Sequence, residues 1–163
     1  MTASGSDDQL EEAKGKIGLV LLVKDLGDIT RYLNIACEYD RVAGRFYLSQ
    51  PDYIERLLEE YSMLQAYDVA TPMLDCDKER WKKDDLPLLD EVGKKRFQAL
   101  VGSLLYLMHV TGPDIAFVII RLSQYSAKPR SQYWDGLKRI LRYLKGTKNA
   151  VLTRGKWVIN MLF

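Results

Sequence analysis

The chain has 163 residues, 47% of them hydrophobic, and a formal net charge of +2. This apolar content suits a packed core and argues against wholesale disorder, whereas the near-neutral charge points to no class of partner. Two cysteines without an N-terminal signal pattern are typical of a reduced intracellular protein, either cytoplasmic or nuclear. The longest apolar run, Ile115–Ile120, is too short to cross a bilayer, and a single histidine cannot build a metal site. We therefore expect no membrane association, no metal and no cofactor.

The first fifty residues predict one helix followed by one β-hairpin. A capping-box pattern at Ser6 indicates a helix over Asp7–Leu22, although two glycines inside it are unfavourable. Apolar and aromatic residues over Arg31–Glu38 predict a strand. Residues Asp40–Gly44 are typical of a turn, and Arg45–Ser49 predicts the returning strand.

Four more helices are expected after the hairpin, because apolar residues recur there at helical spacing. The irregular stretch between the first two, Gln65–Leu89, is expected to be a mobile loop. The third of the four is apolar on most sides and should be the most buried, and Gly146 is expected just beyond the end of the fourth. The predicted helices are 51–61, 90–109, 113–125 and 131–145. The expected fold is thus α+β and mostly helical, with about five helices and one β-hairpin.

Positive residues gather in the last predicted helix, which makes it the best candidate binding element. At 100° per residue, Lys138, Arg142 and Lys145 lie within about 60° of one another, and Arg139 lies further round. Apolar residues occupy the other side. Basic clusters of this kind bind phosphates electrostatically, so the four residues are candidate nucleic-acid ligands. The alternative interpretation is the solvated face of an ordinary amphipathic helix.

Several strings of the sequence resemble the copia-type reverse transcriptase family, and they occur in the family's order. Each string is modest alone, but together they cover roughly residues 24–147. The matching strings are Lys24-Asp25-Leu26-Gly27, Tyr32-Leu33-Asn34-Ile35, Tyr47-Leu48-Ser49-Gln50, Thr71-Pro72-Met73, Leu100-Val101-Gly102-Ser103-Leu104-Leu105-Tyr106-Leu107, Pro113-Asp114-Ile115-Ala116 and Lys138-Arg139-Ile140-Leu141-Arg142-Tyr143-Leu144-Lys145-Gly146-Thr147.

The resemblance implies a division of the chain into three parts. Residues 1–50 resemble the end of a palm with a primer-grip-like hairpin, and residues 51–150 resemble a thumb and connection segment. Residues 151–163 do not match the family, which continues into an RNase H domain. Tyr32, Leu33 and Asn34 correspond to the primer grip, with Asn34 in place of the family glycine. The alternative for these three residues is an ordinary hairpin strand.

The resemblance also implies a loss of catalysis. The family's Tyr-x-Asp-Asp motif would fall just before Met1, and Asp7-Asp8 lacks the preceding tyrosine. Polymerisation needs clustered carboxylates to hold two Mg²⁺ ions. We therefore expect no enzyme activity but a reverse-transcriptase-derived segment with residual affinity for RNA, DNA or an RNA–DNA hybrid. The alternatives are a protein-interaction module, which self-associates or binds an intact reverse transcriptase, and a product with no selected function.

Overall fold

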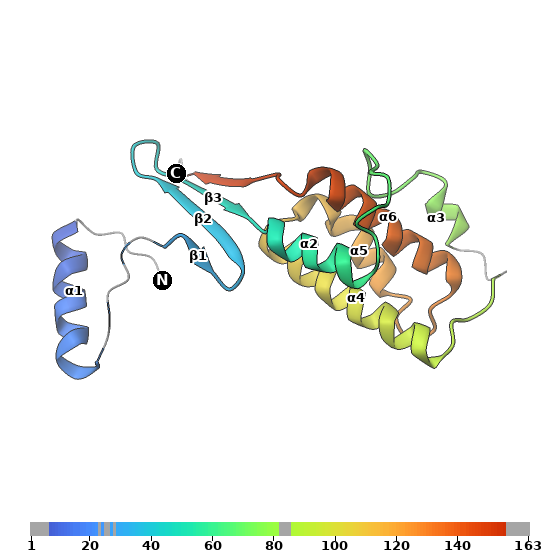
Figure 1. Ribbon diagram of the computed structural model, residues 1–163, viewed down its shortest axis with the longest axis horizontal. Coiled ribbons are helices and arrows are strands. Elements are labelled where there is room, and N and C mark those ends of the chain that lie inside the picture. The colour runs from blue at the N-terminus through green and yellow to red at the C-terminus, as the bar shows by residue number, and fades with distance from the viewer. Residues whose placement is uncertain (1–6, 23, 25–26, 28, 82–85, 156–163) are drawn as a thin grey trace, which may run out of the picture.

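The structure is a computed structural model that describes residues 7–22, 24, 27, 29–81 and 86–155. Its helices and strands follow the expected class, mostly helical α+β, with five helices of eight residues or more. Ser6, the predicted cap of the first helix, lies outside the described residues. In chain order the elements are α1 (Asp7–Val20), β1 (Arg31–Tyr32), β2 (Ile35–Asp40), β3 (Arg45–Ser49), α2 (Pro51–Glu60), α3 (Asp77–Arg80), α4 (Glu91–Val110), the 3-10 helix η1 (Pro113–Ile115), α5 (Ala116–Ser123), α6 (Ser131–Thr147) and β4 (Leu152–Gly155) (Figure 1).

The predicted strand over Arg31–Glu38 is interrupted, and this changes the sheet. Leu33 and Asn34 have φ angles of 48° and 65°, and they turn the chain between β1 and β2. Two successive residues with positive φ form the kind of tight turn that joins antiparallel strands. The single hairpin of the prediction thus becomes two hairpins that share β2.

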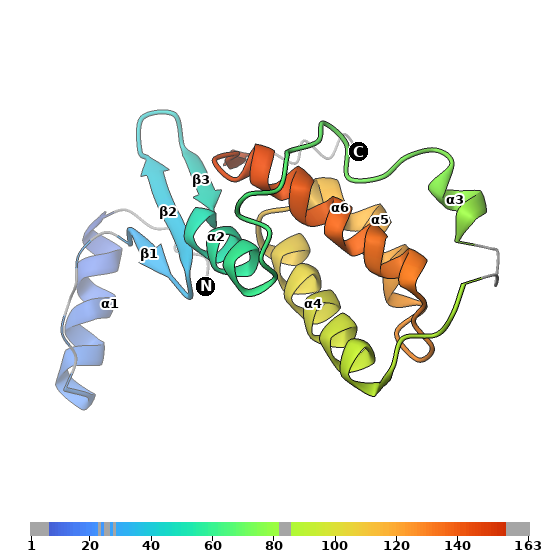
Figure 2. The ribbon, with the colours of Figure 1, turned by 45° about the vertical axis from the view of Figure 1, so that its right-hand side comes forward.

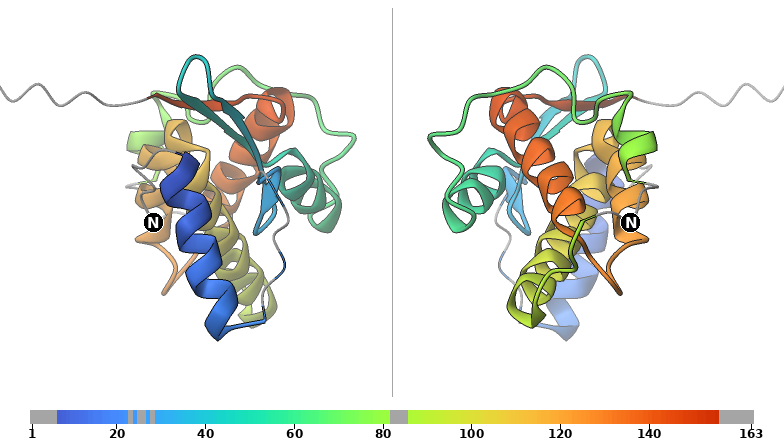
Figure 3. Two further views of the ribbon diagram at one scale, coloured as in Figure 1. Left: turned by 90° about the vertical axis from the view of Figure 1, so that its left-hand side faces the viewer. Right: turned by 90° about the vertical axis from the view of Figure 1, so that its right-hand side faces the viewer.

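A fourth strand completes the sheet from the far end of the chain. β4 pairs antiparallel with β3, giving the order β1-β2-β3-β4. Figure 3 shows β4 leaving α6 and returning to the hairpin. The beginning of the expected tail, 151–163, is therefore part of the sheet, whereas residues 156–163 lie outside the described residues.

The hydrophobic core lies among the helices α2, α4, α5 and α6 (Figure 2). Local signals position these helices as expected: Pro51 begins α2, and the Asp90 carboxylate caps α4 by accepting a hydrogen bond from the Gly93 amide at 2.8 Å. The expectation that the third of these helices is the most buried is wrong. Within α5, Phe117 and Ile120 are exposed, because the other helices cover only one side of it.

The stretch Gln65–Leu89 is more ordered than a mobile loop over its described residues. It contains α3, after which Trp81 is only 2% exposed. The Tyr133 hydroxyl of α6 donates to the Trp81 carbonyl at 3.2 Å, and Arg80 forms an ion pair with Asp135 at 3.2 Å. The segment is therefore anchored to α6 through a buried tryptophan, which the periodicity of the sequence did not reveal.

Gly146 lies inside α6 instead of following it, because this helix continues to Thr147. An added Cβ at Gly146 would lie 3.1 Å from the Cβ of Asp68. The glycine thus allows the segment between α2 and α3 to approach the helix closely.

Candidate nucleic-acid interface

The basic helix α6 is fixed by its apolar side. Leu137, Ile140, Leu141 and Leu144 are buried against the other helices, as the predicted apolar face requires. Burial of these side chains sets the rotation of the helix about its axis. The opposite side of α6, with its basic residues, consequently faces the segment that follows α2.

Three of the four predicted basic residues contact that segment. The Lys145 ammonium donates to the Ala66 carbonyl at 2.6 Å, and Arg139 Nη2 donates to the Thr71 hydroxyl at 3.1 Å. Arg142 Nη1 donates to the Tyr67 hydroxyl at 2.5 Å. These three cations are therefore held in place by the chain itself.

The positive charge of this surface is not neutralised by these contacts. Every acceptor is an uncharged hydroxyl or carbonyl oxygen, so the cations keep their full charge. The Lys138 ammonium has no partner among the described residues, and Lys145 uses one of three donors. Asp68, exposed beside Gly146, is the only carboxylate between Gln65 and Pro72. The arrangement can present donors and charge to a phosphate.

Arg139 differs from the other three basic residues. Its Nε atom is buried and has no hydrogen-bond partner among the described residues, although Nη2 reaches Thr71. Lying further round the helix, as the sequence predicts, it is turned partly inward. We infer that Arg139 contributes to packing as well as to charge.

The predicted primer-grip residues form the β1–β2 turn. Tyr32 is 57% exposed and Leu33 66% exposed, and Asn34 is exposed at the second turn position. The Tyr106 hydroxyl of α4 donates to the Leu33 carbonyl at 2.9 Å. Asparagine tolerates positive φ better than most residues, which explains physically how Asn34 stands where the family has glycine.

The structure does not connect the two predicted sets of site residues. The β1–β2 turn contacts Tyr106 of α4, whereas the basic residues of α6 contact the segment after α2. Sequence reasoning missed Ala66 and Tyr67 altogether. For Thr71 a signal existed, because Thr71-Pro72-Met73 is one of the strings that resemble the family. The resemblance assigned no function to that string.

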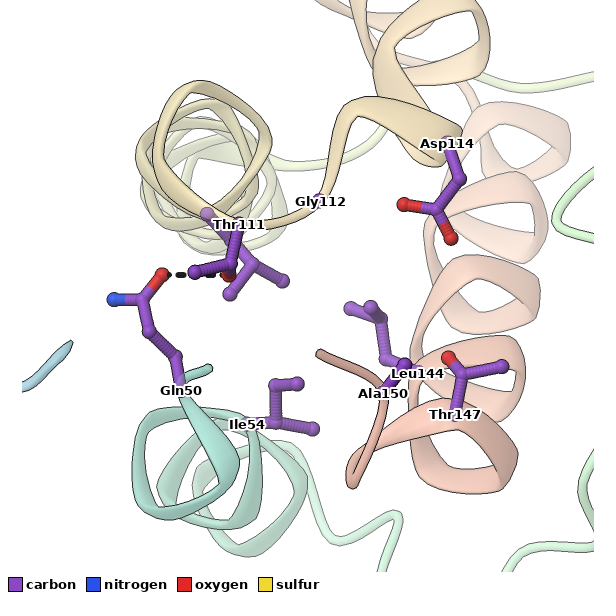
Figure 4. A pocket seen from close by; sticks show the side chains of 9 residues that line it. Gln50, Ile54, Thr111, Gly112, Asp114, Leu144, Thr147 and Ala150 are labelled. Atoms are coloured by element: carbon purple, nitrogen blue, oxygen red, sulfur yellow. Dashed lines mark hydrogen bonds between the residues drawn. The ribbon is translucent and has the colours of Figure 1, made fainter. Parts of the chain in front are cut away.

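A small cavity lies between α2, the end of α4 and α6 (Figure 4). Its volume is about 30 Å³, enough for roughly one water molecule. The Thr111 hydroxyl donates to Gln50 Oε1 at 2.9 Å, and Gln50 Nε2 is buried without a partner among the described residues. Across the cavity, Tyr143 donates to Asp114 at 2.6 Å; this bond, with burial and the Asp114 charge, raises the pKa of Tyr143 to about 12. Asp114 thus serves as a structural acceptor in a site too small for a substrate.

Two further properties of the described residues bear on function. They contain no group of three or more His, Cys, Asp and Glu side chains that could hold a metal ion. None of the helices within the described ranges has both the length and the apolar composition needed to cross a membrane.

Comparison with known proteins finds similarity to transposon polyproteins. The chain is 35% identical over 159 residues to a retrovirus-related Pol polyprotein from transposon TNT 1-94 of Nicotiana tabacum, covering 95% of this chain and 12% of that protein. It is 40% identical over 130 residues to the Pol polyprotein from transposon RE2 of Arabidopsis thaliana, covering 77% of this chain and 8% of that protein. A putative transposon Ty5-1 protein of Saccharomyces cerevisiae is 26% identical over 152 residues, which cover 93% of this chain and 48% of that protein.

The chain therefore spans only a small part of the Pol polyproteins that it matches. No protein-family model matches it, and no solved structure does.

Proposed function

The chain belongs to the copia-type retrotransposon Pol polyproteins, and from this premise we propose that it is a catalytically inactive segment that binds nucleic acid through α6. Catalytic inactivity is proposed because the sequence contains no Tyr-x-Asp-Asp motif. Purified chain with primer-template, Mg²⁺ and nucleotides should extend no primer above a protein-free control. Reproducible primer extension that is lost when the α6 cations are replaced would contradict this part of the proposal.

The binding proposal rests on the cations of α6, whose hydrogen-bond acceptors in the segment after α2 are uncharged. We call the three residues Lys138, Arg142 and Lys145 the basic face. The positions of Arg142 and Lys145 are fixed by contacts to the chain, so these two side chains lose less entropy when a phosphate binds. Contacts between cations and phosphates do not distinguish one base sequence from another. Binding should therefore be weak, sequence-independent and sensitive to salt.

Replacement of all three residues of the basic face by Gln tests this proposal. Glutamine keeps the helix propensity and leaves the buried side of α6 unchanged. Affinity for an RNA–DNA hybrid should fall several-fold or more at low salt. The log–log salt slope should become shallower by about 0.7 to 0.9 for each phosphate that the variant no longer neutralises.

A matched control removes the same charge elsewhere. Lys94 and Lys95 lie in the first turns of α4, and Lys128 lies in the link before α6, at the other end of the bundle (Figure 1). Their triple replacement by Gln should leave the salt slope nearly unchanged. Equal slopes for both triple variants, with circular dichroism showing both folded, would contradict the role of the basic face.

A second candidate function is self-association through the sheet, which one observation favours. The strand register puts Tyr32, Cys37, Tyr39, Phe46 and Leu48 on one face, yet Tyr39 and Phe46 remain 46% and 44% exposed. Exposed apolar faces of this kind often mark protein contacts. Light scattering at tens of micromolar protein should then give a dimer or larger, and a monomer would contradict it.

A further inference from the structure

An exposed tyrosine ring stands within the basic surface of α6. Tyr67 is 68% exposed, although the guanidinium carbon of Arg142 lies 4.9 Å from its ring centroid. The segment that carries it is anchored on both sides of the ring, by Lys145 at Ala66 and by Arg139 at Thr71. The ring is thus positioned by its neighbours on α6, while most of its surface stays open to solvent.

An aromatic ring among cations is the combination that binds single-stranded nucleic acid. Successive bases stack on aromatic side chains while basic residues hold the backbone. Tyr67 supplies the ring, Arg142 supplies charge beside it, and Lys138 lies about one helical turn before Arg142 on α6. A single exposed tyrosine packed on an arginine is common on protein surfaces. Here, however, the segment that carries Tyr67 is also anchored to α6, and the charge of the neighbouring cations is not neutralised. An incidental contact between the two side chains would need neither feature.

We propose that Tyr67 is a stacking site for an unpaired base of single-stranded DNA or RNA, whose phosphates contact Lys138 and Arg142. The inference rests on the proposed nucleic-acid binding and specifies the ligand. A continuous duplex keeps its base faces stacked on each other and offers none to the ring. An unpaired strand offers both a base face and phosphates.

The chain leaves donors available for those phosphates. Arg142 directs Nη1 to the Tyr67 hydroxyl and Nε to the Lys138 carbonyl at 3.4 Å, so its Nη2 has no partner among the described residues. The Lys138 ammonium likewise has no hydrogen-bond partner within the part of the chain that the structure describes. The Asp68 carboxylate lies against Gly146, so its negative charge disfavours a phosphate near that end of α6. The strand should therefore run along the Lys138 and Arg142 side.

Two oligonucleotides with the same phosphates separate stacking from charge. One is oligothymidylate of about twelve nucleotides, within the usual range of single-strand sites, and the other is an abasic oligomer of equal length. Fluorescence anisotropy with the full chain should show the thymidylate bound roughly 5- to 150-fold more tightly, the range that one stacked base supplies. Tyr67→Leu should reduce thymidylate affinity to the abasic level. Tyr67→Phe, which keeps the ring, should retain the preference.

Affinity for the abasic oligomer is the control, because it reports whether a variant keeps its fold and its contacts to phosphates. Tyr67→Leu should leave it unchanged within about twofold, because a stacked base adds to the phosphate contacts and does not replace them. If Tyr67→Leu lowers both affinities equally, the ring only positions Arg142, and the stacking site is wrong. Equal wild-type affinities, or a thymidylate preference that survives in Tyr67→Leu, would also overturn it.

The same titrations distinguish the two proposals. If neither oligomer binds the wild-type chain, the stacking site is wrong, and the nucleic-acid function is wrong as well if the RNA–DNA hybrid also fails to bind. If thymidylate binding needs Tyr67 but does not change with salt, the stacking site stands and the phosphate role of the basic face fails. Salt-sensitive binding that is equal for both oligomers gives the opposite outcome.

Discussion

The helical bundle buries its apolar side chains, whereas the sheet leaves part of its apolar face exposed. Every described hydrophobic residue that is fully buried lies between Ile54 and Leu144, and none belongs to a strand. In the sheet, alternation places apolar residues on one face, but Tyr39 and Phe46 stack on each other at 4.3 Å while staying partly exposed. Both regions obey amphipathic patterning, yet only the bundle covers its apolar side within the described chain.

This difference shows that the pattern of apolar residues can specify a helix or a strand without ensuring that another part of the chain covers its apolar side. The bundle should hold most of the folding free energy, since burial of apolar area is the dominant stabilising term. The sheet relies on hydrogen bonds between its strands and on a few links to the bundle. These are the Tyr106 bond to Leu33 and the 2.6 Å ion pair between Arg31 and Asp52.

Trp81→Ala should give the largest loss of stability. Removing a large aromatic side chain from a core costs about 3–5 kcal/mol, and Trp81 is 2% exposed. Phe46→Ala in the half-exposed sheet should cost only about 1 kcal/mol, the value of an aromatic pair. Chemical denaturation followed by helical circular dichroism measures both. Similar losses for the two variants would break the contrast between bundle and sheet.

Gly136→Ala should destabilise the bundle although alanine favours helix. A Cβ at this position would lie 2.8 Å from Cζ2 of the buried Trp81, so overpacking should cost about 1–3 kcal/mol. Gly102→Ala in α4 is the control, because its Cβ would meet nothing within 4 Å. That variant should gain about 0.5–1 kcal/mol from helix propensity. If both variants gain stability, Trp81 is not packed tightly against α6.

Tyr143→Phe should weaken the link between η1 and α6 in a pH-dependent way. The hydrogen bond to Asp114 is the main cause that raises the pKa of Tyr143 from 10.0 to about 12. A raised pKa means that the stabilisation is complete below pH 10 and is lost as pH rises through about 12. Because solvent reaches the bond, we expect only about 0.5 kcal/mol, the low end for a hydrogen bond. A stability difference that persists unchanged above pH 12 would contradict this assignment.

Leu33→Gly should strengthen the sheet slightly. Leucine at φ 48° bears left-handed strain that glycine avoids, and Leu33 loses little burial because it is 66% exposed. The net gain should be a few tenths of a kcal/mol, about 0.5 at most, since glycine loses more entropy on folding. Slower hydrogen exchange at the Cys37 amide, which donates to Thr30, would report it. Asn34→Gly is the control and should change little; faster exchange in Leu33→Gly would show that the leucine side chain holds the turn.

Local signals made the helices predictable, whereas long-range packing did not. The Asp90 cap and the apolar stripes lie within one or two turns, so the sequence contains them. The turn at Leu33 was missed because leucine is no turn residue, and strand pairing imposes its positive φ. The burial of Trp81 was missed because it depends on Gly136, far along the chain.

The candidate site divides in the same way. Helical geometry was sufficient to place Lys138, Arg142 and Lys145 on one side of α6. It could not show that Arg142 meets Tyr67, which lies 75 positions earlier in the sequence. Binding by the basic face and by the turn residues Tyr32, Leu33 and Asn34 stays a prediction.

The pairing of β4 with β3 constrains the order in which the molecule folds. Its register joins Leu48 to Leu152, more than a hundred residues apart along the chain. Closing so long a loop is entropically costly before the intervening residues are compact, whereas the β2–β3 hairpin closes over four residues, 41–44. In refolding followed by pulsed hydrogen exchange, the hairpin amides can gain protection early. Those shared by β3 and β4 should wait until the helices have brought the two ends of the bundle together.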